Sequence, residues 1–154
     1  IAKKELLEKS NPDLPNILKY DAHANEGSML NTPNTFGWYV AGKMFDWYLE
    51  NGGVAEMEKQ SVAKTAMLYD LIDKSDFYLN PVNPEQRSIN NVVFTIVNSE
   101  LEKVFLEEAE KADLRYLKGH RTVGGMRASI YNSMKIESVS VLKDFMENFE
   151  KNYG

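Results

Sequence analysis

The stretch that most constrains the fold is Asn91-Val92-Val93-Phe94-Thr95-Ile96-Val97. It is rich in β-branched residues and apolar on both faces, as a strand of a covered sheet requires. Directly after it, Ser99-Glu100-Leu101-Glu102 has the form of a capping box and predicts a helix that runs to about Lys111. The pairing of such a strand with such a helix predicts a sheet covered by helices.

Helical and extended segments alternate along the rest of the chain. Helical spacing predicts a long helix over residues 54–75, whose apolar stripe is Val62, Ala66, Tyr69 and Ile72, and a last helix before Gly154. Short strands are predicted at 17–20, 77–79 and 127–131, and a loop is predicted at 81–90. Helices interleaved with a few strands indicate an α/β fold, or an α+β sandwich, with the sheet covered by helices.

Composition excludes several classes of function. The 154 residues contain no cysteine and two histidines that lie far apart, which argues against disulfides, thiolate metal sites and His-rich metal sites. Apolar residues make up 43% of the chain, yet there is no run of the roughly 20 needed to span a bilayer and no secretory signal, so we expect a cytoplasmic protein without membrane contact. A net charge of −5 speaks against nucleic-acid binding. The chain starts at Ile1 rather than methionine, and we expect it to be a fragment.

The charge distribution is uneven. Residues 114–136 contain no carboxylate, and they hold three of the four arginines of the chain (Arg115, Arg121 and Arg127) together with Lys118 and Lys135. Arginine forks suit carboxylates and phosphates, and the nearby glycine pair Gly124-Gly125 lets backbone N–H groups approach an anion. This window therefore suggests a small-anion site. A solvated basic face, or a partner for acidic residues elsewhere in the fold, explains the same pattern.

A second candidate site precedes a predicted helix. Thr32 is a good N-cap and Pro33 suits the first helical position, so a helix is predicted from here to Asn51-Gly52-Gly53. On one interpretation Asn31 and Thr32 only cap this helix. On the other, the free N–H groups of its first turn bind a phosphate.

Two motifs carry a resemblance to a known family. Gly119-His120-Arg121 followed by Gly124-Gly125-Met126-Arg127-Ala128-Ser129-Ile130-Tyr131-Asn132 is similar to the C-terminal signature of the phosphoserine aminotransferases, and Asn31-Thr32-Pro33-Asn34-Thr35-Phe36 is similar to their segment that contacts the cofactor phosphate. These are pyridoxal-phosphate enzymes of fold type I. The resemblance implies the C-terminal part of such an enzyme: residues 1–32 end the large cofactor-binding domain, 33–53 form a connecting helix, and 54–154 form the small domain with a mixed sheet covered by helices.

The resemblance also assigns roles to individual residues. The family's enzymes are homodimers that exchange an amino group between glutamate and 3-phosphohydroxypyruvate, which yields 2-oxoglutarate and O-phosphoserine. It implies that His120 and Arg121 bind the substrate phosphate from the partner subunit, and that Arg127 binds the substrate α-carboxylate. Asn31 and Thr32 would contact the phosphate of pyridoxal phosphate across the dimer.

The bond-making group of the family is absent from this chain. The lysine that carries the cofactor lies upstream of the matching region, and none of the 14 lysines present stands in its context. We therefore expect no catalytic residue here and no transamination by the chain alone. An alternative hypothesis is a free-standing module that binds small phosphorylated metabolites through the same basic loop.

Overall fold

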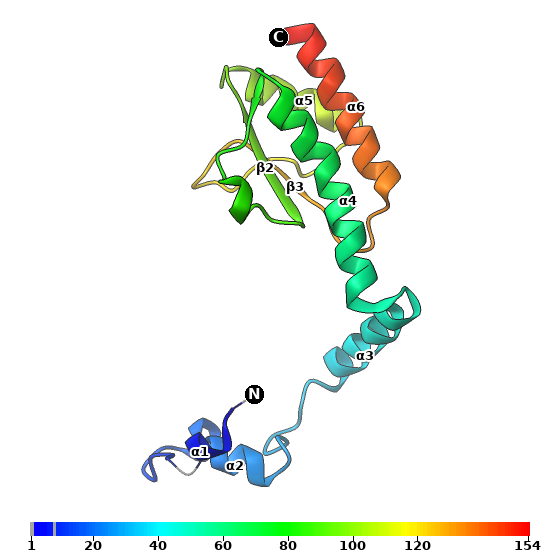
Figure 1. Ribbon diagram of the computed structural model, residues 1–154. Helices are drawn as coiled ribbons and strands as arrows, with labels where there is room; N and C mark the ends of the chain where they lie inside the picture. The colour runs from blue at the N-terminus through cyan, green and yellow to red at the C-terminus, as the bar shows by residue number, and fades with distance from the viewer. Residues whose placement is uncertain (1, 8) are drawn as a thin grey trace. The chain divides into compact units, whose positions relative to one another are not determined.

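The computed structural model describes residues 2–7 and 9–154, which form two compact units, 1–47 and 48–154. The first unit contains short helical elements and the start of a longer helix, and none of its described residues is buried. These elements are α1 (Lys4–Leu7), the 3-10 helix η1 (Asn16–Leu18), α2 (Tyr20–Asn25) and α3 (Thr35–Glu50) (Figure 1). The strand predicted at 17–20 is wrong, because Pro15 opens a helical turn in which its carbonyl accepts the N–H of Leu18 at 2.9 Å.

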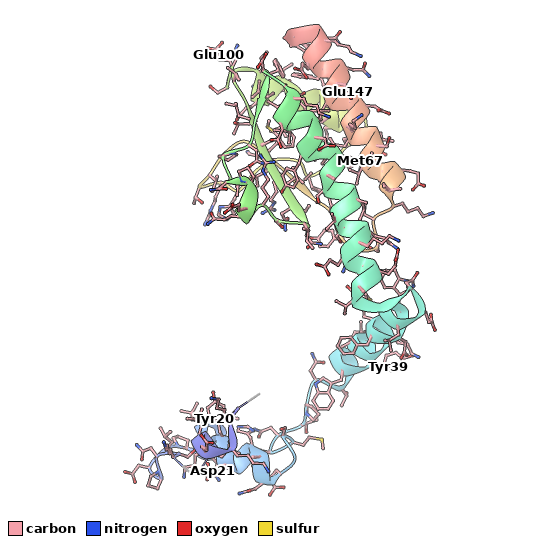
Figure 2. The ribbon with its side chains drawn as sticks, viewed as in Figure 1. Tyr20, Asp21, Tyr39, Met67, Glu100 and Glu147 are labelled. Atoms are coloured by element: carbon pink, nitrogen blue, oxygen red, sulfur yellow. The ribbon has the colours of Figure 1, made fainter. Side chains whose placement is uncertain are left out.

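Helix α3 begins later than predicted. The side-chain oxygen of Asn34 accepts the N–H of Gly37 at 3.0 Å, so Asn34 rather than Thr32 caps the helix. The prediction of Thr32 as the cap is therefore wrong, because asparagine is at least as strong a cap and lies next to the first helical residue. No described residue of α3 is buried. The ring of Tyr39, for example, projects from the helix and is 65% exposed (Figure 2).

The second unit contains the hydrophobic core. Its elements are α4 (Gly53–Lys74), β1 (Tyr78–Leu79), the 3-10 helix η2 (Pro84–Gln86), β2 (Asn91–Ile96), α5 (Leu101–Lys111), β3 (Met126–Ser129) and α6 (Ile136–Tyr153). The two long helices and the three strands predicted in this region are confirmed to within a few residues. Helices α4 and α6 run side by side next to the sheet (Figure 1).

The sheet has the order β1-β2-β3, and both pairings are antiparallel. The mixed sheet predicted for this region is therefore wrong for the described residues. The chain returns from β1 to β2 through a loop, and it passes back along the sheet after α5 before it enters β3, so neither connection is the crossover that a parallel pair needs.

The sheet is buried on one face only. Phe94 lies opposite Met126 and Val92 lies opposite Ala128, and all four side chains are buried. The ring of Phe94 meets that of Phe105 on α5 edge to face, with the centroids 5.7 Å apart. Alternate residues of β2 face away from the helices and are only half-buried. The expectation of a strand covered on both faces thus holds for one face.

Both outer edges of the sheet are short or occupied. Strand β1 contains two residues. The outer edge of β3 pairs with the preceding segment, where Lys118 bridges Met126 and the N–H of Arg127 donates to the carbonyl of Leu117 at 2.7 Å. This segment leads directly into the basic loop, so the sheet fixes where that loop leaves and returns.

Two details of the helices differ from the sequence-based expectations. No capping box forms at α5, because Asn98 accepts the N–H of Glu100 (3.1 Å) and the N-cap makes no side-chain bond. The buried stripe of α4 is displaced from the predicted one, and Val62 is 47% exposed. The buried residues of α4 are Met57, Ser61, Lys64, Thr65, Leu68, Leu71 and Ile72.

None of the helices in the described part of the chain is long and apolar enough to cross a membrane.

Candidate functional site

The basic loop closes on itself through glycine backbone. The N–H of Gly119 donates to the carbonyl of Gly125 at 2.8 Å, and the carbonyl of His120 accepts the N–H groups of Val123 and Gly124. A Cβ at Gly119 would lie 2.1 Å from the carbonyl oxygen of Gly124, so no other residue fits there without moving the backbone. Residues 119–125 thus fold into a tight loop. The backbone of Gly119 lies so close to that of Gly124 and Gly125 that a side chain at position 119 would clash.

His120 is oriented by its own loop. Its Nδ1 atom lies 2.7 Å from the hydroxyl oxygen of Thr122, and the backbone N–H of Thr122 points at the same nitrogen at 3.4 Å. In the neutral ring, an N–H aimed at Nδ1 favours the tautomer that carries the proton on Nε2. The Nε2–H group is then available to donate to an external acceptor.

His120 and Arg121 line a cavity of about 1130 Å³ between the basic loop and α5. The loop side contributes Lys118 and glycine backbone, while the helix side contributes both acidic and basic side chains. Cations on the loop and backbone close to the surface make this cavity suitable for a small anion. The cavity is large enough for a ligand of metabolite size.

Arg127 lines a second cavity, of about 460 Å³. It lies on β3 opposite Val93, on the face of the sheet that turns away from the buried aromatic cluster. Its Nε atom is buried and has no hydrogen-bond partner among the described residues. A buried donor without a partner is costly, so this guanidinium has unused capacity for an acceptor such as a carboxylate.

The two cavities share a wall. Leu114, Tyr116 and Leu117 line both of them, so His120 and Arg121 lie on one side of this segment and Arg127 lies on the other. Tyr116 itself has a positive φ of 63° and is 88% exposed. Such a backbone is strained for a side-chain-bearing residue, and strain of this kind is concentrated at functional sites.

The basic window is only partly neutralised by the fold. Arg115 pairs with its neighbour Asp113, with Nη2 2.8 Å from the carboxylate. Arg121 and Arg127 make no ion pair with any carboxylate in residues 2–7 and 9–154. Among the described residues, the basic window thus has one ion pair, with the adjacent Asp113, and none with acidic residues elsewhere in the fold.

The predicted site residues fall in two different units. Asn31 and Thr32 belong to the first unit, whereas His120, Arg121 and Arg127 belong to the second. Asn31 and Thr32 are exposed and precede the first turn of α3 by several residues. Thr32 is therefore not the cap of this helix, and the contact of Asn31 and Thr32 with a cofactor phosphate stays a prediction.

Sequence reasoning missed Lys64. Its side chain on α4 is only 2% exposed, and its ammonium donates to the carbonyls of Tyr131, Asn132 and Met134 at 3.1, 3.2 and 3.0 Å. Burial lowers the pKa of this ammonium. A signal was present, because Lys64 continues the buried line of Met57 and Ser61 along α4, but a lysine on an apolar stripe usually reaches solvent.

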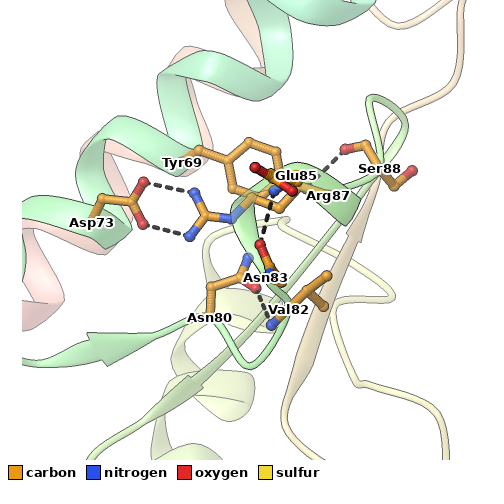
Figure 3. Close-up of polar contacts among 8 residues, drawn as sticks. All are labelled: Tyr69, Asp73, Asn80, Val82, Asn83, Glu85, Arg87 and Ser88. Atoms are coloured by element: carbon orange, nitrogen blue, oxygen red, sulfur yellow. Dashed lines mark hydrogen bonds and ion pairs between the residues drawn. The ribbon is translucent and has the colours of Figure 1, made fainter.

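The lone arginine outside the window has a structural role. Arg87 forms a two-bond pair with Asp73 at 2.6 and 2.7 Å, and its guanidinium lies over the ring of Tyr69, 4.8 Å from the centroid (Figure 3). The hydroxyl of Tyr69 donates to the carbonyl of Ser88. This cluster holds the loop between β1 and β2 against α4. The guanidinium of Arg87 is thus bound to Asp73 and Tyr69.

Comparison with known proteins shows which family the chain resembles in sequence and fold. The family model for aminotransferase class-V matches residues 3–142. A phosphoserine aminotransferase of Acinetobacter baylyi is 50% identical over all 154 residues, which span 43% of that protein. A solved phosphoserine aminotransferase from Bacillus circulans subsp. alkalophilus superposes with a TM-score of 0.91 at 38% identity, over 99% of this chain and 43% of that one.

A further solved structure, of phosphoserine aminotransferase with bound pyridoxal phosphate from Trichomonas vaginalis, gives a TM-score of 0.82 at 33% identity. It covers 94% of this chain and 42% of its own. The chain therefore spans less than half the length of the relatives it matches. Since the family model accounts for most of its residues, the chain belongs to the aminotransferase class-V family.

Proposed function

We propose that this chain is the C-terminal, substrate-binding part of a phosphoserine aminotransferase, which transfers an amino group between glutamate and 3-phosphohydroxypyruvate. The observation that carries the proposal is the pair of adjacent cavities, one lined by His120 and Arg121 and the other by Arg127. A substrate with a phosphate at one end and a carboxylate at the other needs two cationic sites a short distance apart. The aminotransferases to which the chain is similar supply the reaction class.

The proposed roles follow from donor geometry. Arg127 offers a planar fork and a buried Nε without a partner, which suits the α-carboxylate. His120 offers Nε2–H and Arg121 a permanent charge to the phosphate. None of these groups breaks a bond. They hold the amino-bearing carbon in a fixed orientation, and orientation of this kind accounts for several kcal/mol of a reaction barrier.

Pyridoxal phosphate, when bound, supplies the electron sink that amino-group transfer requires. Asn31 and Thr32 are our proposed contacts to its phosphate, and their exposed polar side chains fit that role. Lys64, the one buried lysine in residues 2–7 and 9–154, has its three donors occupied by carbonyls and is not available for attachment of the cofactor. The lysine required for that attachment is proposed to lie outside this chain.

The proposed organisation is that of the family: residues 1–32 end the large domain, 33–53 connect, and 54–154 form the small domain of a homodimeric cytoplasmic enzyme. The exposed apolar side chains of α3 support a larger assembly, since a helix with Phe36, Phe45 and Leu49 each at least 65% exposed is unusual on a free surface.

The test is the visible absorption of the full-length gene product that contains this chain. We expect a yellow protein whose colour fades on addition of glutamate and returns with 3-phosphohydroxypyruvate. Arg127→Ala should prevent fading at the same glutamate concentration, while Lys59→Ala, at an exposed cation that pairs with Glu56 and lines neither cavity, serves as the control. A colourless full-length product that still binds phosphoserine would exclude the aminotransferase and leave the metabolite-binding module.

A further inference from the structure

Lys64 is a charged side chain in the core to which the proposed reaction assigns no role. An ammonium has three donors, and here all three are used by backbone carbonyls of one short segment, Tyr131 to Met134. These carbonyls lie 67 to 70 positions away in the sequence. Burying an ammonium is costly unless its donors are satisfied, so the three carbonyls must stay within hydrogen-bond distance of Lys64.

A second contact reinforces the first. One turn before Lys64, the buried hydroxyl of Ser61 donates to the side-chain oxygen of Asn132 at 3.3 Å. The amide nitrogen of Asn132 in turn donates to the hydroxyl of Tyr48 at 3.2 Å. Side chains of α4 therefore hold the segment after β3 in two ways. They bind the main-chain carbonyls of that segment, and they bind the side chain of Asn132.

The held segment continues directly from the strand of Arg127. Tyr131 and Met134 line the same cavity as Arg127, so two of the three carbonyls that Lys64 binds belong to residues that form its wall. At the outer edge of β3, the backbone N–H of Arg127 donates to the carbonyl of Leu117. Arg127 is thus held to the preceding segment by its own N–H group, and the segment that Lys64 anchors begins four residues further along the chain.

We propose that Lys64 is a positioning residue for carboxylate recognition: it fixes residues 131–134 against α4 and so sets the shape of the Arg127 cavity. Lys64 touches no ligand, and it acts through the main chain that follows β3. The phosphate cavity of His120 and Arg121 contains none of the carbonyls that Lys64 binds. This role of Lys64 rests on the proposed function in one respect: the proposed function makes a substrate carboxylate the ligand of Arg127.

The experiment compares Lys64→Met with wild type in the full-length protein. Methionine keeps a similar length but removes the charge and the donors. Two ligands are titrated separately by calorimetry: glutamate, which probes the carboxylate site, and inorganic phosphate, which probes the basic loop. Hydrogen exchange of residues 130–135 is measured on the same samples. Thr65→Val is the matched control, because Thr65 is equally buried and its hydroxyl bonds only within α4.

We expect Lys64→Met to weaken glutamate binding roughly tenfold or more and to raise exchange in residues 130–135, with phosphate binding unchanged. Ser61→Ala should give a smaller change of the same kind. Loss of both ligands in parallel would show a general loss of structure and overturn the proposal, as would unchanged glutamate binding. If wild type binds no glutamate, the proposed function fails by itself, and the exchange data then show whether Lys64 holds the segment.

Discussion

Arg127 lies directly opposite Val93 in the pairing of β3 with β2, between two residues, Met126 and Ala128, whose side chains are buried on the other face. A shift of the register by one residue would move the guanidinium into the aromatic core, so the sheet strongly fixes the side on which this arginine lies. The face of the sheet on which Arg127 lies is a consequence of strand alternation and does not depend on a ligand.

Arg127→Lys tests the importance of the guanidinium fork. Lysine keeps the charge but cannot form two parallel bonds to a carboxylate, so we expect a loss of about 1.5–3 kcal/mol of glutamate binding free energy, or roughly ten- to a hundredfold in Kd. Calorimetry on the full-length protein measures this. Arg87→Lys, at an arginine that pairs with Asp73 and lines neither cavity, should bind glutamate like wild type. Equal losses in both variants would contradict the assignment.

Gly119→Ala tests the closure of the basic loop. The new methyl group would meet the carbonyl oxygens of Gly124 and Gly125, so the loop must open, at a cost of about 1–3 kcal/mol. We expect weaker binding of inorganic phosphate, measured by titration of the His120 ring signals in NMR spectra. Gly42→Ala is the control, because a methyl group there meets no atom within 4 Å, and it should leave phosphate binding unchanged.

The tautomer of His120 is a separate prediction. The contacts of Nδ1 with Thr122 predict that the neutral ring carries its proton on Nε2. Nitrogen-15 chemical shifts of the ring report this directly, and an Nδ1–H signal in the wild type would rule it out. Thr122→Ser should preserve the tautomer, and Thr122→Val, which loses the hydroxyl contact but keeps the backbone N–H, should retain a weaker preference for the same form.

Acid should weaken the attachment of the loop between β1 and β2. Hydrogen bonds from Arg87 hold the pKa of Asp73 below its ordinary value. The stabilisation is therefore fully present above about pH 4, the pKa of an unfolded aspartate, and is lost as the pH falls through the lowered value. Urea midpoints of wild type and Asp73→Asn should differ at pH 7 and converge in acid. Asp46→Asn, in an exposed pair 3.6 Å from Lys43, should differ little at either pH.

Phe105 is the centre of the aromatic cluster. It is fully buried and its ring meets those of Tyr78, Phe94, Phe145 and Phe149. Phe105→Ala should lower the free energy of unfolding by about 3–5 kcal/mol, measured by urea denaturation. Val141→Ala, at a position that is 55% exposed, should change it by less than about 0.5 kcal/mol. A small effect at Phe105 would mean that the cluster repacks.

Local patterns predicted most of the second unit. The strand at 91–96, the long helix α4 and the last helix follow from periodicity and β-branched content, which are properties of neighbouring residues. The start of α3 was missed because Thr32 and Asn34 compete as caps, and sequence alone does not decide between them. The antiparallel sheet was missed because its direction depends on how the chain returns after α5.

The site was predictable only in part. Resemblance pointed to His120, Arg121 and Arg127, but the wall that separates their cavities is a property of the folded chain. Lys64 was missed because its partners are main-chain oxygens. Any residue supplies a carbonyl, so no pattern of side chains marks the segment that an ammonium will bind.

The two edges of the sheet bear on whether this protein aggregates at high concentration. An open edge of unpaired N–H and C=O groups is a template on which other chains add strands and grow into fibrils. Here one edge is only two residues long, and the other is already paired with the segment that carries Lys118. The loop that gathers the positive charge thus also keeps the sheet from polymerising, so a deletion within residues 117–119 would create an aggregation-prone edge.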